Sequence, residues 1–145
     1  MVEETSIVVL RFLLMAGIGF SVSVPAASSV PQPHNVSDLA ATISAKALGC
    51  QDLQVAPPPS EAIEGTCTVW HEAGVELDVL SSHAVLTKQI PKAVAAVCAA
   101  LRKTHSSVKL VFVVGSNWVA TFESTVNARP LAKAMNAKIQ PLKCS

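Results

Sequence analysis

The sequence contains no tyrosine, and with only four Phe and two Trp its aromatic content is 4%. A hydrophobic core must therefore be built mainly from Val, Leu, Ile and Ala. Charged residues are also scarce, at 14%, while half of the residues are hydrophobic, which argues against a disordered chain. The net charge of +1 lacks the basic excess of nucleic-acid-binding proteins, so we expect no nucleic-acid partner. The 145 residues suffice for one domain with an appendage.

Motifs of recognised chemistry are missing too. The chain has no G-x-S-x-G, H-E-x-x-H, P-loop or dinucleotide-binding fingerprint, and its cysteines form no C-x-x-C pair. The run Ser81-Ser82-His83 is not a triad by adjacency, because triads are assembled in space. Glu72 and Glu76 lie on a predicted solvated hairpin, which gives no reason to expect acid–base catalysis. We predict a non-enzyme without cofactor or metal; a hydrolase without a recognisable motif is the alternative.

The four histidines share no spacing that is typical of metal ligands. A metal site built from His71 and His83 with Glu72 is conceivable across the predicted hairpin. We favour the simpler interpretation, in which all four are ordinary surface histidines.

Charges of opposite sign are separated along the chain. The region from Asp52 to Asp78 carries six acids and no Lys or Arg, whereas the region from Lys88 to Lys143 carries nine bases and one acid, Glu123. A bipolar surface of this kind can orient a partner. We favour the alternative that an acidic half and a basic half attract each other within the fold.

The N-terminal region has the features of an export signal. Residues 7–26 are apolar apart from Arg11 and two serines, and the uninterrupted core from Phe12 to Val24 is about thirteen residues. That length fits the roughly 7–15 apolar residues of a signal peptide and falls short of the roughly 20 that span a bilayer. Small residues that suit signal peptidase follow around Ala26.

We therefore divide the chain into a signal peptide or N-terminal anchor (residues 1–27), a linker (28–36) and a single domain (37–145). Glu3 and Glu4 are unusual in a signal peptide, whose first residues are normally basic. The alternative is an uncleaved anchor, with membrane attachment through residues 7–26. No Cys follows the apolar run directly, so lipid modification is not supported.

The domain alternates between helical and strand patterns. Apolar spacing predicts helices over 38–48, from between Thr87 and Pro91 to about residue 105, and over 128–139, with Ser37 and Asn127 as N-caps. Strands are predicted over 50–56, 65–71, 75–80, 108–114 and 118–122. The order α-β-β-β-α-β-β-α predicts an α+β fold, with helices packed on an antiparallel sheet of about five strands.

Two hairpins fix the expected sheet. The first turns at Glu72-Ala73-Gly74, and in its second strand Glu76 and Asp78 alternate with apolar residues, which predicts one solvated face. The second turns at Gly115-Ser116-Asn117, which are expected to supply the positive φ values that a tight turn requires. Because its first strand is apolar on both faces, we expect this hairpin at the centre of the sheet, with Trp118 in the core.

The four cysteines, Cys50, Cys67, Cys98 and Cys144, are an even number in a chain that we expect to be exported, so they predict two disulfides. Three pairings exist. We favour Cys50–Cys67, which would join the end of the first helix to the sheet, and Cys98–Cys144, which would join the middle helix to the tail. The alternative is four buried thiols in a cytosolic protein.

Three short motifs resemble a known group of proteins. Leu48-Gly49-Cys50, Gly65-Thr66-Cys67-Thr68 and Val114-Gly115-Ser116-Asn117-Trp118-Val119 are similar in spacing to those of small exported proteins and lipoproteins of high-GC actinobacteria. The likeness covers roughly residues 37–139. It implies export and a Cys50–Cys67 bridge, and it implies no activity, because that family is largely uncharacterised. The chain departs from the pattern in lacking a lipobox Cys and in having Cys98 and Cys144.

These observations lead to a functional expectation. We predict a secreted or cell-envelope module, stabilised by disulfides, that binds a protein or a small ligand. The Pro57-Pro58-Pro59 segment and the separated charges are candidate contact features, although a stiff connector is the simpler interpretation of the prolines. A membrane-anchored accessory protein and an enzyme without a recognisable motif are the alternatives.

Overall fold

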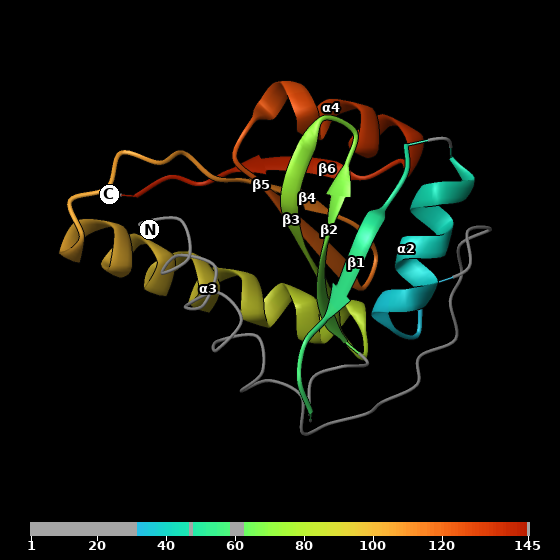
Figure 1. Ribbon diagram of the computed structural model, residues 1–145. Coiled ribbons are helices and arrows are strands. Elements are labelled where there is room, and N and C mark those ends of the chain that lie inside the picture. Colours follow the sequence, from blue (N-terminus) through green and yellow to red (C-terminus); the bar gives the residue numbers. More distant parts are fainter. Residues whose placement is uncertain (1–31, 47, 59–62, 145) are drawn as a thin grey trace.

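The computed structural model describes residues 32–46, 48–58 and 63–144. Within these ranges the chain forms three helices and six strands (Figure 1). In chain order they are α2 (Val36–Ala45), β1 (Gln51–Val55), β2 (Glu64–Val69), β3 (Glu72–Val79), α3 (His83–Lys103), β4 (Val111–Val114), β5 (Trp118–Phe122), α4 (Thr125–Ala134) and β6 (Lys138–Pro141). The predicted signal peptide or anchor, residues 1–27, lies outside the described residues, as does the first part of the predicted linker.

The six strands form one antiparallel sheet with the order β1-β2-β3-β5-β4-β6. This confirms the predicted α+β class and the order of elements, with one strand more than the expected five. The predicted central hairpin is β4–β5, and β5 lies between β3 and β4. The edges of the sheet are formed by β1 and β6.

Helices lie on both faces of the sheet (Figure 1). On one face α2 and α4 bury Leu39, Ile43 and Leu131 against apolar side chains of β3, β4 and β5. On the other face α3 buries Leu86 and Val97 in a second cluster, which includes Leu80, Leu110, Phe112 and Val119. Strand β4 is therefore apolar on both sides, as its run of valines predicts.

Helices α2 and α3 both begin earlier in the sequence than predicted. Asn35, and not Ser37, is the N-cap of α2, and its side chain accepts a hydrogen bond from the Asp38 N–H at 2.8 Å. Ser82 caps α3, so Pro91 lies inside the helix and not in its first turn. Interior proline costs about 3 kcal/mol. The early start offsets this cost, because the additional turns bury Leu86 completely.

Among the described residues, α3 is the one helix that is long and apolar enough to cross a membrane. Its apolar face nevertheless packs on the sheet, and its outer side exposes Lys88 and Lys92. This two-sided character is that of a helix in a folded domain.

The first hairpin turns two residues earlier than predicted. Val69 pairs with Glu72, so Trp70 and His71 form the turn, and Trp70 adopts a left-handed φ of 58°. Gly74, with φ of 69°, lies within β3, where the register shifts. A glycine of positive φ marks a bulge as readily as a turn, which explains the error.

The C-terminal region also differs from the prediction. Ser124, and not Asn127, caps α4, and the helix ends at Ala134, so Ile139 lies in a strand and not in the helix. Asn136 has a left-handed φ of 50°, which stops the helix. The following residues pair with β4 as β6. Leu131, Met135 and Ile139 are four residues apart, which is the spacing of one face of a helix, although Ile139 lies beyond the end of α4.

Candidate functional site

The turn between β4 and β5 is held together by a glycine and a tryptophan. The Gly115 N–H donates to the Trp118 carbonyl at 2.9 Å. The indole of Trp118 occupies the space where any side chain at position 115 would begin. Trp118 itself is only 3% exposed, which confirms its predicted place in the core. The positive φ values predicted for Gly115, Ser116 and Asn117 are not found, since none of the three residues has one. Glycine is required at position 115 by the close approach of the ring instead.

Asn117, in the same turn, connects three segments of the chain. Its Nδ2 donates to the Pro33 carbonyl at 2.8 Å and to the Leu80 carbonyl at 3.0 Å. The Leu80 N–H in turn donates to the Asn117 carbonyl at 2.7 Å. Asn117 is 4% exposed, so these bonds lie out of water. The turn therefore fixes both the approach to α2 and the end of β3.

His83, the first residue of α3, contacts the turn from a third direction. Its Nδ1 lies 2.6 Å from the Ser116 carbonyl oxygen. Because a carbonyl only accepts, Nδ1 carries the proton in this bond. In the neutral ring Nε2 is then an acceptor, held in place by the bond on the other side of the imidazole.

A cavity of about 300 Å³ lies beside the turn. Segments that are far apart in the sequence line it: Pro33, Leu39, Thr42, His83, Val114, Gly115, Ser116, Trp118, Met135, Asn136 and Lys138. Leu39 and Trp118 give it an apolar wall, while His83 and Lys138 supply nitrogen groups. No acid is found among the described residues that line it.

The cavity combines apolar residues with a few polar groups. Ligand pockets are mostly apolar and contain a few polar groups that fix orientation. Lys138 offers N–H donors and a positive charge, and Nε2 of His83 offers a second polar group. A nucleophile activated by a base needs the two side chains in hydrogen-bond contact. The described residues around this cavity form no such pair, since Ser116 bonds His83 through its backbone carbonyl.

The predicted disulfide residues are joined as expected. Cys50 bonds Cys67, which ties the segment after α2 to β2. Cys98 of α3 bonds Cys144 in the tail after β6. Two disulfides in a chain of this size indicate an oxidising compartment.

The conceivable metal site at His71, His83 and Glu72 is not assembled. His71 immediately precedes β3 and Glu72 begins it, whereas His83 follows the end of that strand. A strand of eight residues spans about 26 Å, which separates the two histidines widely. Among the described residues, no group of three His, Cys, Asp or Glu side chains is placed to hold a metal ion.

Glu72 has a structural role that the sequence did not reveal. Its carboxylate accepts hydrogen bonds from the Glu123 N–H at 2.7 Å and the Ser124 N–H at 3.1 Å, and from the Asn127 side chain at 3.3 Å. These groups lie directly before α4 and in its first turn. A carboxylate at a helix N-terminus is stabilising.

The face of the first hairpin that was predicted to be solvated is buried. Glu76 and Asp78 are each 1% exposed, and Glu64, which pairs with Asp78, is 2% exposed. The alternation of apolar and acidic residues in β3 therefore distinguishes two buried faces of the strand, and neither face is exposed to solvent. The pattern predicted the direction of these side chains correctly but not their environment.

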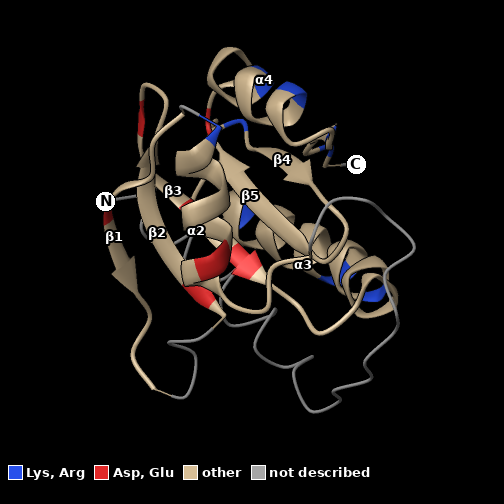
Figure 2. Cartoon of the chain, turned by 90° about the vertical axis from the view of Figure 1, so that its right-hand side faces the viewer, with Lys and Arg blue, Asp and Glu red and all other residues tan. Residues whose placement is uncertain are grey.

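The other candidate contact features lie apart from the cavity. Pro57 and Pro58 are exposed next to β1, while Pro59 lies outside the described residues. Acids are found on the β1–β3 side of the molecule, and bases are found on α3 and α4 (Figure 2).

No known family model matches this chain, and no curated protein or solved structure matches it either.

Proposed function

We propose that this chain is an exported, disulfide-stabilised binding module that holds a small ligand in the cavity beside the β4–β5 turn. It acts in the extracellular space or at the cell envelope. The resemblance to small exported actinobacterial proteins is part of this proposal.

Export is supported by two independent features. The apolar N-terminal run with small residues near Ala26 fits a signal peptide, and the two disulfides fit an oxidising compartment. N-terminal sequencing of the product should find a mature chain that begins near Ala27. A full-length chain in the membrane fraction would instead indicate the anchored alternative, and a full-length cytosolic chain would contradict export.

Binding is supported chiefly by the construction of the cavity. Behind its wall lie Trp118 and Leu39, which are 3% and 0% exposed, so the site is backed by the hydrophobic core. The bonds of Asn117 and His83 hold the turn before any ligand arrives. Such preorganisation lowers the entropic cost of binding.

The ligand that fits is a small molecule with an apolar body and one acceptor group. The apolar part would face Val114 and Met135, which line the cavity and are half-buried, and the acceptor would face Lys138. A collection of small aromatic and aliphatic carboxylates, tested by ligand-observed NMR, is a suitable set of probes.

Two phenylalanine substitutions test the location. Thr42→Phe adds a ring to the wall of the cavity and should abolish binding. Thr87→Phe is a matched control, because Thr87 and Thr42 each donate a hydroxyl hydrogen bond four residues back in a helix, and Thr87 lies outside the cavity. Binding that survives Thr42→Phe, or a collection in which nothing binds at millimolar concentration, would contradict the proposal.

A further inference from the structure

His83 lines the cavity beside the β4–β5 turn and is held there by one of its two ring nitrogens. The side chain is exposed, so it lies at the rim of the cavity. Nδ1 lies 2.6 Å from the Ser116 carbonyl oxygen and donates to it, because a carbonyl has no proton to give. Nε2, on the other side of the ring, has no hydrogen-bond partner among the described residues. Nε2 is therefore the atom of His83 that is left for a ligand.

A second proton on His83 changes Nε2 alone. In the neutral ring Nε2 is a hydrogen-bond acceptor, and in the imidazolium it is a donor that shares a positive charge. The bond from Nδ1 to the Ser116 carbonyl exists in both forms, so the ring keeps its place. Histidine is the side chain whose charge ordinarily changes between pH 5 and pH 8. The cavity can therefore present a different group to a ligand without any change in its walls.

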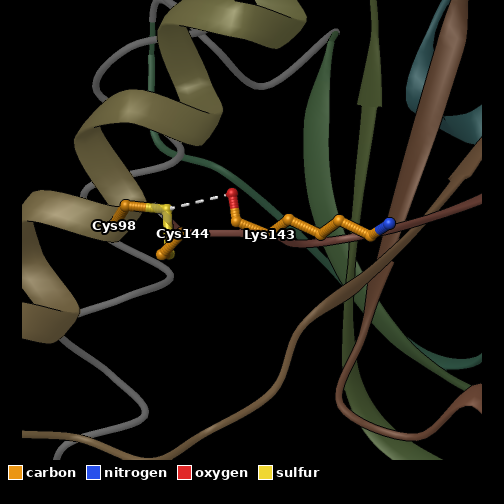
Figure 3. The surroundings of a disulfide bond; sticks show 3 residues. All are labelled: Cys98, Lys143 and Cys144. Atoms are coloured by element: carbon orange, nitrogen blue, oxygen red, sulfur yellow. Dashed lines mark hydrogen bonds between the residues drawn. A yellow bond between two sulfur atoms is a disulfide. The ribbon is translucent and has the colours of Figure 1, made fainter.

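A disulfide fixes the helix of His83 relative to the strand of Lys138, the other basic residue that lines the cavity. Cys98, further along α3, is bonded to Cys144 in the tail that follows β6 (Figure 3). Figure 3 shows Cys98 reaching from the helix to this tail, where its sulfur lies 3.9 Å from the Lys143 carbonyl oxygen. The two basic groups of the cavity thus belong to elements that are joined covalently.

No acid is found among the described residues that line the cavity. Asp38, in the first turn of α2, accepts a hydrogen bond from the His34 N–H at 3.2 Å. Other charged or titratable side chains on the elements around His83 also do not line the cavity: His34, Asp38, Lys46, Asp78, Lys88 and Lys133. The lining residues therefore supply no negative charge to accompany an imidazolium, and an anionic ligand would supply it.

We infer that this cavity takes up an anionic ligand together with a proton, which is held at Nε2 of His83. The inference rests on the proposed function and adds the charge of the ligand and the pH response of the site. At about 300 Å³ the cavity is at the lower end of the size range of ligand pockets, so one small anion reaches both Lys138 and His83. The proton comes from solvent, to which His83 is exposed.

The direction of the pH response follows from linkage. A negative charge beside an imidazole favours its protonated form. Because coupling between two binding events is reciprocal, the protonated ring binds the anion more tightly. Affinity for anions should therefore be highest at acidic pH and fall as the pH rises through the range in which His83 loses its proton. An uncharged ligand should show no such response.

Four anionic probes and one neutral probe test this response by ligand-observed NMR at about pH 5.5 and about pH 8. The anions are benzoate, hexanoate, benzenesulfonate and hexanesulfonate, and benzyl alcohol is the neutral probe. The sulfonates stay ionised over the whole range, so their pH response is that of the protein. We expect the anions to bind about threefold more weakly at the higher pH, which is the effect of one solvent-exposed ion pair.

Three substitutions assign the response to His83. His83→Gln keeps a donor for the Ser116 carbonyl but cannot gain a proton, so its affinity for the sulfonates should be the same at both pH values. His34→Gln is the matched control, because His34 is exposed and does not line the cavity, and the pH response should remain. Lys138→Gln removes a charge that is present at both pH values, so it should weaken binding about equally at each.

A further measurement needs no variant. In the wild-type protein, the pH midpoint of the His83 ring resonances should rise when the cavity is saturated with benzenesulfonate, because the linkage is reciprocal. Equal affinities for the anions at both pH values, an unmoved midpoint, or a pH response that survives His83→Gln would overturn the inference and leave the proposed function intact. No binding of any probe at either pH value would contradict both.

Discussion

The indole ring of Trp118 lies against the backbone of Gly115, so that a Cβ at position 115 would overlap its atoms. The two residues are also joined through the backbone, by the bond from the Gly115 N–H to the Trp118 carbonyl. The ring is buried between β4, β5 and the α4 side of the sheet. The turn and the core are thus one packing unit, and the cavity beside them depends on it.

Gly115→Ala should lower the free energy of unfolding by about 1–3 kcal/mol, because the new methyl group must displace the indole. In a Trp118→Leu background the same change should cost less than about 1 kcal/mol, since the obstructing ring is gone. Urea unfolding of the four proteins gives the coupling directly. Additive effects of the two substitutions would show that the ring is not the obstacle.

Asn117→Ala should lower the free energy of unfolding by about 2 kcal/mol, because it removes the side-chain amide that donates hydrogen bonds to two backbone carbonyls. Hydrogen exchange should also become faster at the start of α2, where Pro33 loses its anchor. Ser116→Ala is the control, since the Ser116 hydroxyl makes only a long contact of 3.3 Å with Asn117. An Asn117→Ala variant as stable as Ser116→Ala would contradict the bridging role.

Glu72→Gln should lower the free energy of unfolding by about 2 kcal/mol, because it removes the negative charge of the carboxylate that accepts hydrogen bonds from the two backbone N–H groups before α4. Asp52→Asn is the control. Asp52 is exposed on the edge strand β1, and asparagine tolerates its left-handed φ of 55°. Chemical unfolding at constant pH compares the two, and equal stabilities would refute the capping role of Glu72.

Local chemistry predicted much of the fold. The β4–β5 hairpin follows from alternation around Gly115, and the position of Trp118 in the core follows from its place in the return strand. Errors arose where a residue has two uses. Pro91 suggested a helix start, but the burial of Leu86 outweighs its cost, and Ile139 fits a helix although β4 needs a partner strand.

The candidate site was less predictable, because its parts meet only through tertiary structure. His83 and Ser116 are 33 residues apart, and Glu72 and Ser124 are 52 apart. No spacing rule connects such pairs. Lys138 was expected in the last helix and reaches the cavity because β6 replaces the end of that helix.

Removal of each disulfide should lower the free energy of unfolding by an amount that increases with the number of residues in the loop that the disulfide closes. Cys50 and Cys67 are separated by 17 residues and Cys98 and Cys144 by 46. Loop-closure entropy then gives about 3 kcal/mol for the first and about 4 kcal/mol for the second. Urea unfolding of Cys50→Ala/Cys67→Ala and Cys98→Ala/Cys144→Ala measures both.

Thiol counting provides the control for that experiment. The denatured wild-type chain should show no reactive thiol before reduction and four after it, whereas each double variant should show two after reduction. Cys144 is exposed and Cys67 is 3% exposed, so the first variant pair also loses buried sulfur at the sheet. That loss of packing reduces the difference between the stability losses of the two double variants. A Cys98→Ala/Cys144→Ala protein as stable as wild type would show that the tail is held against α3 by packing alone.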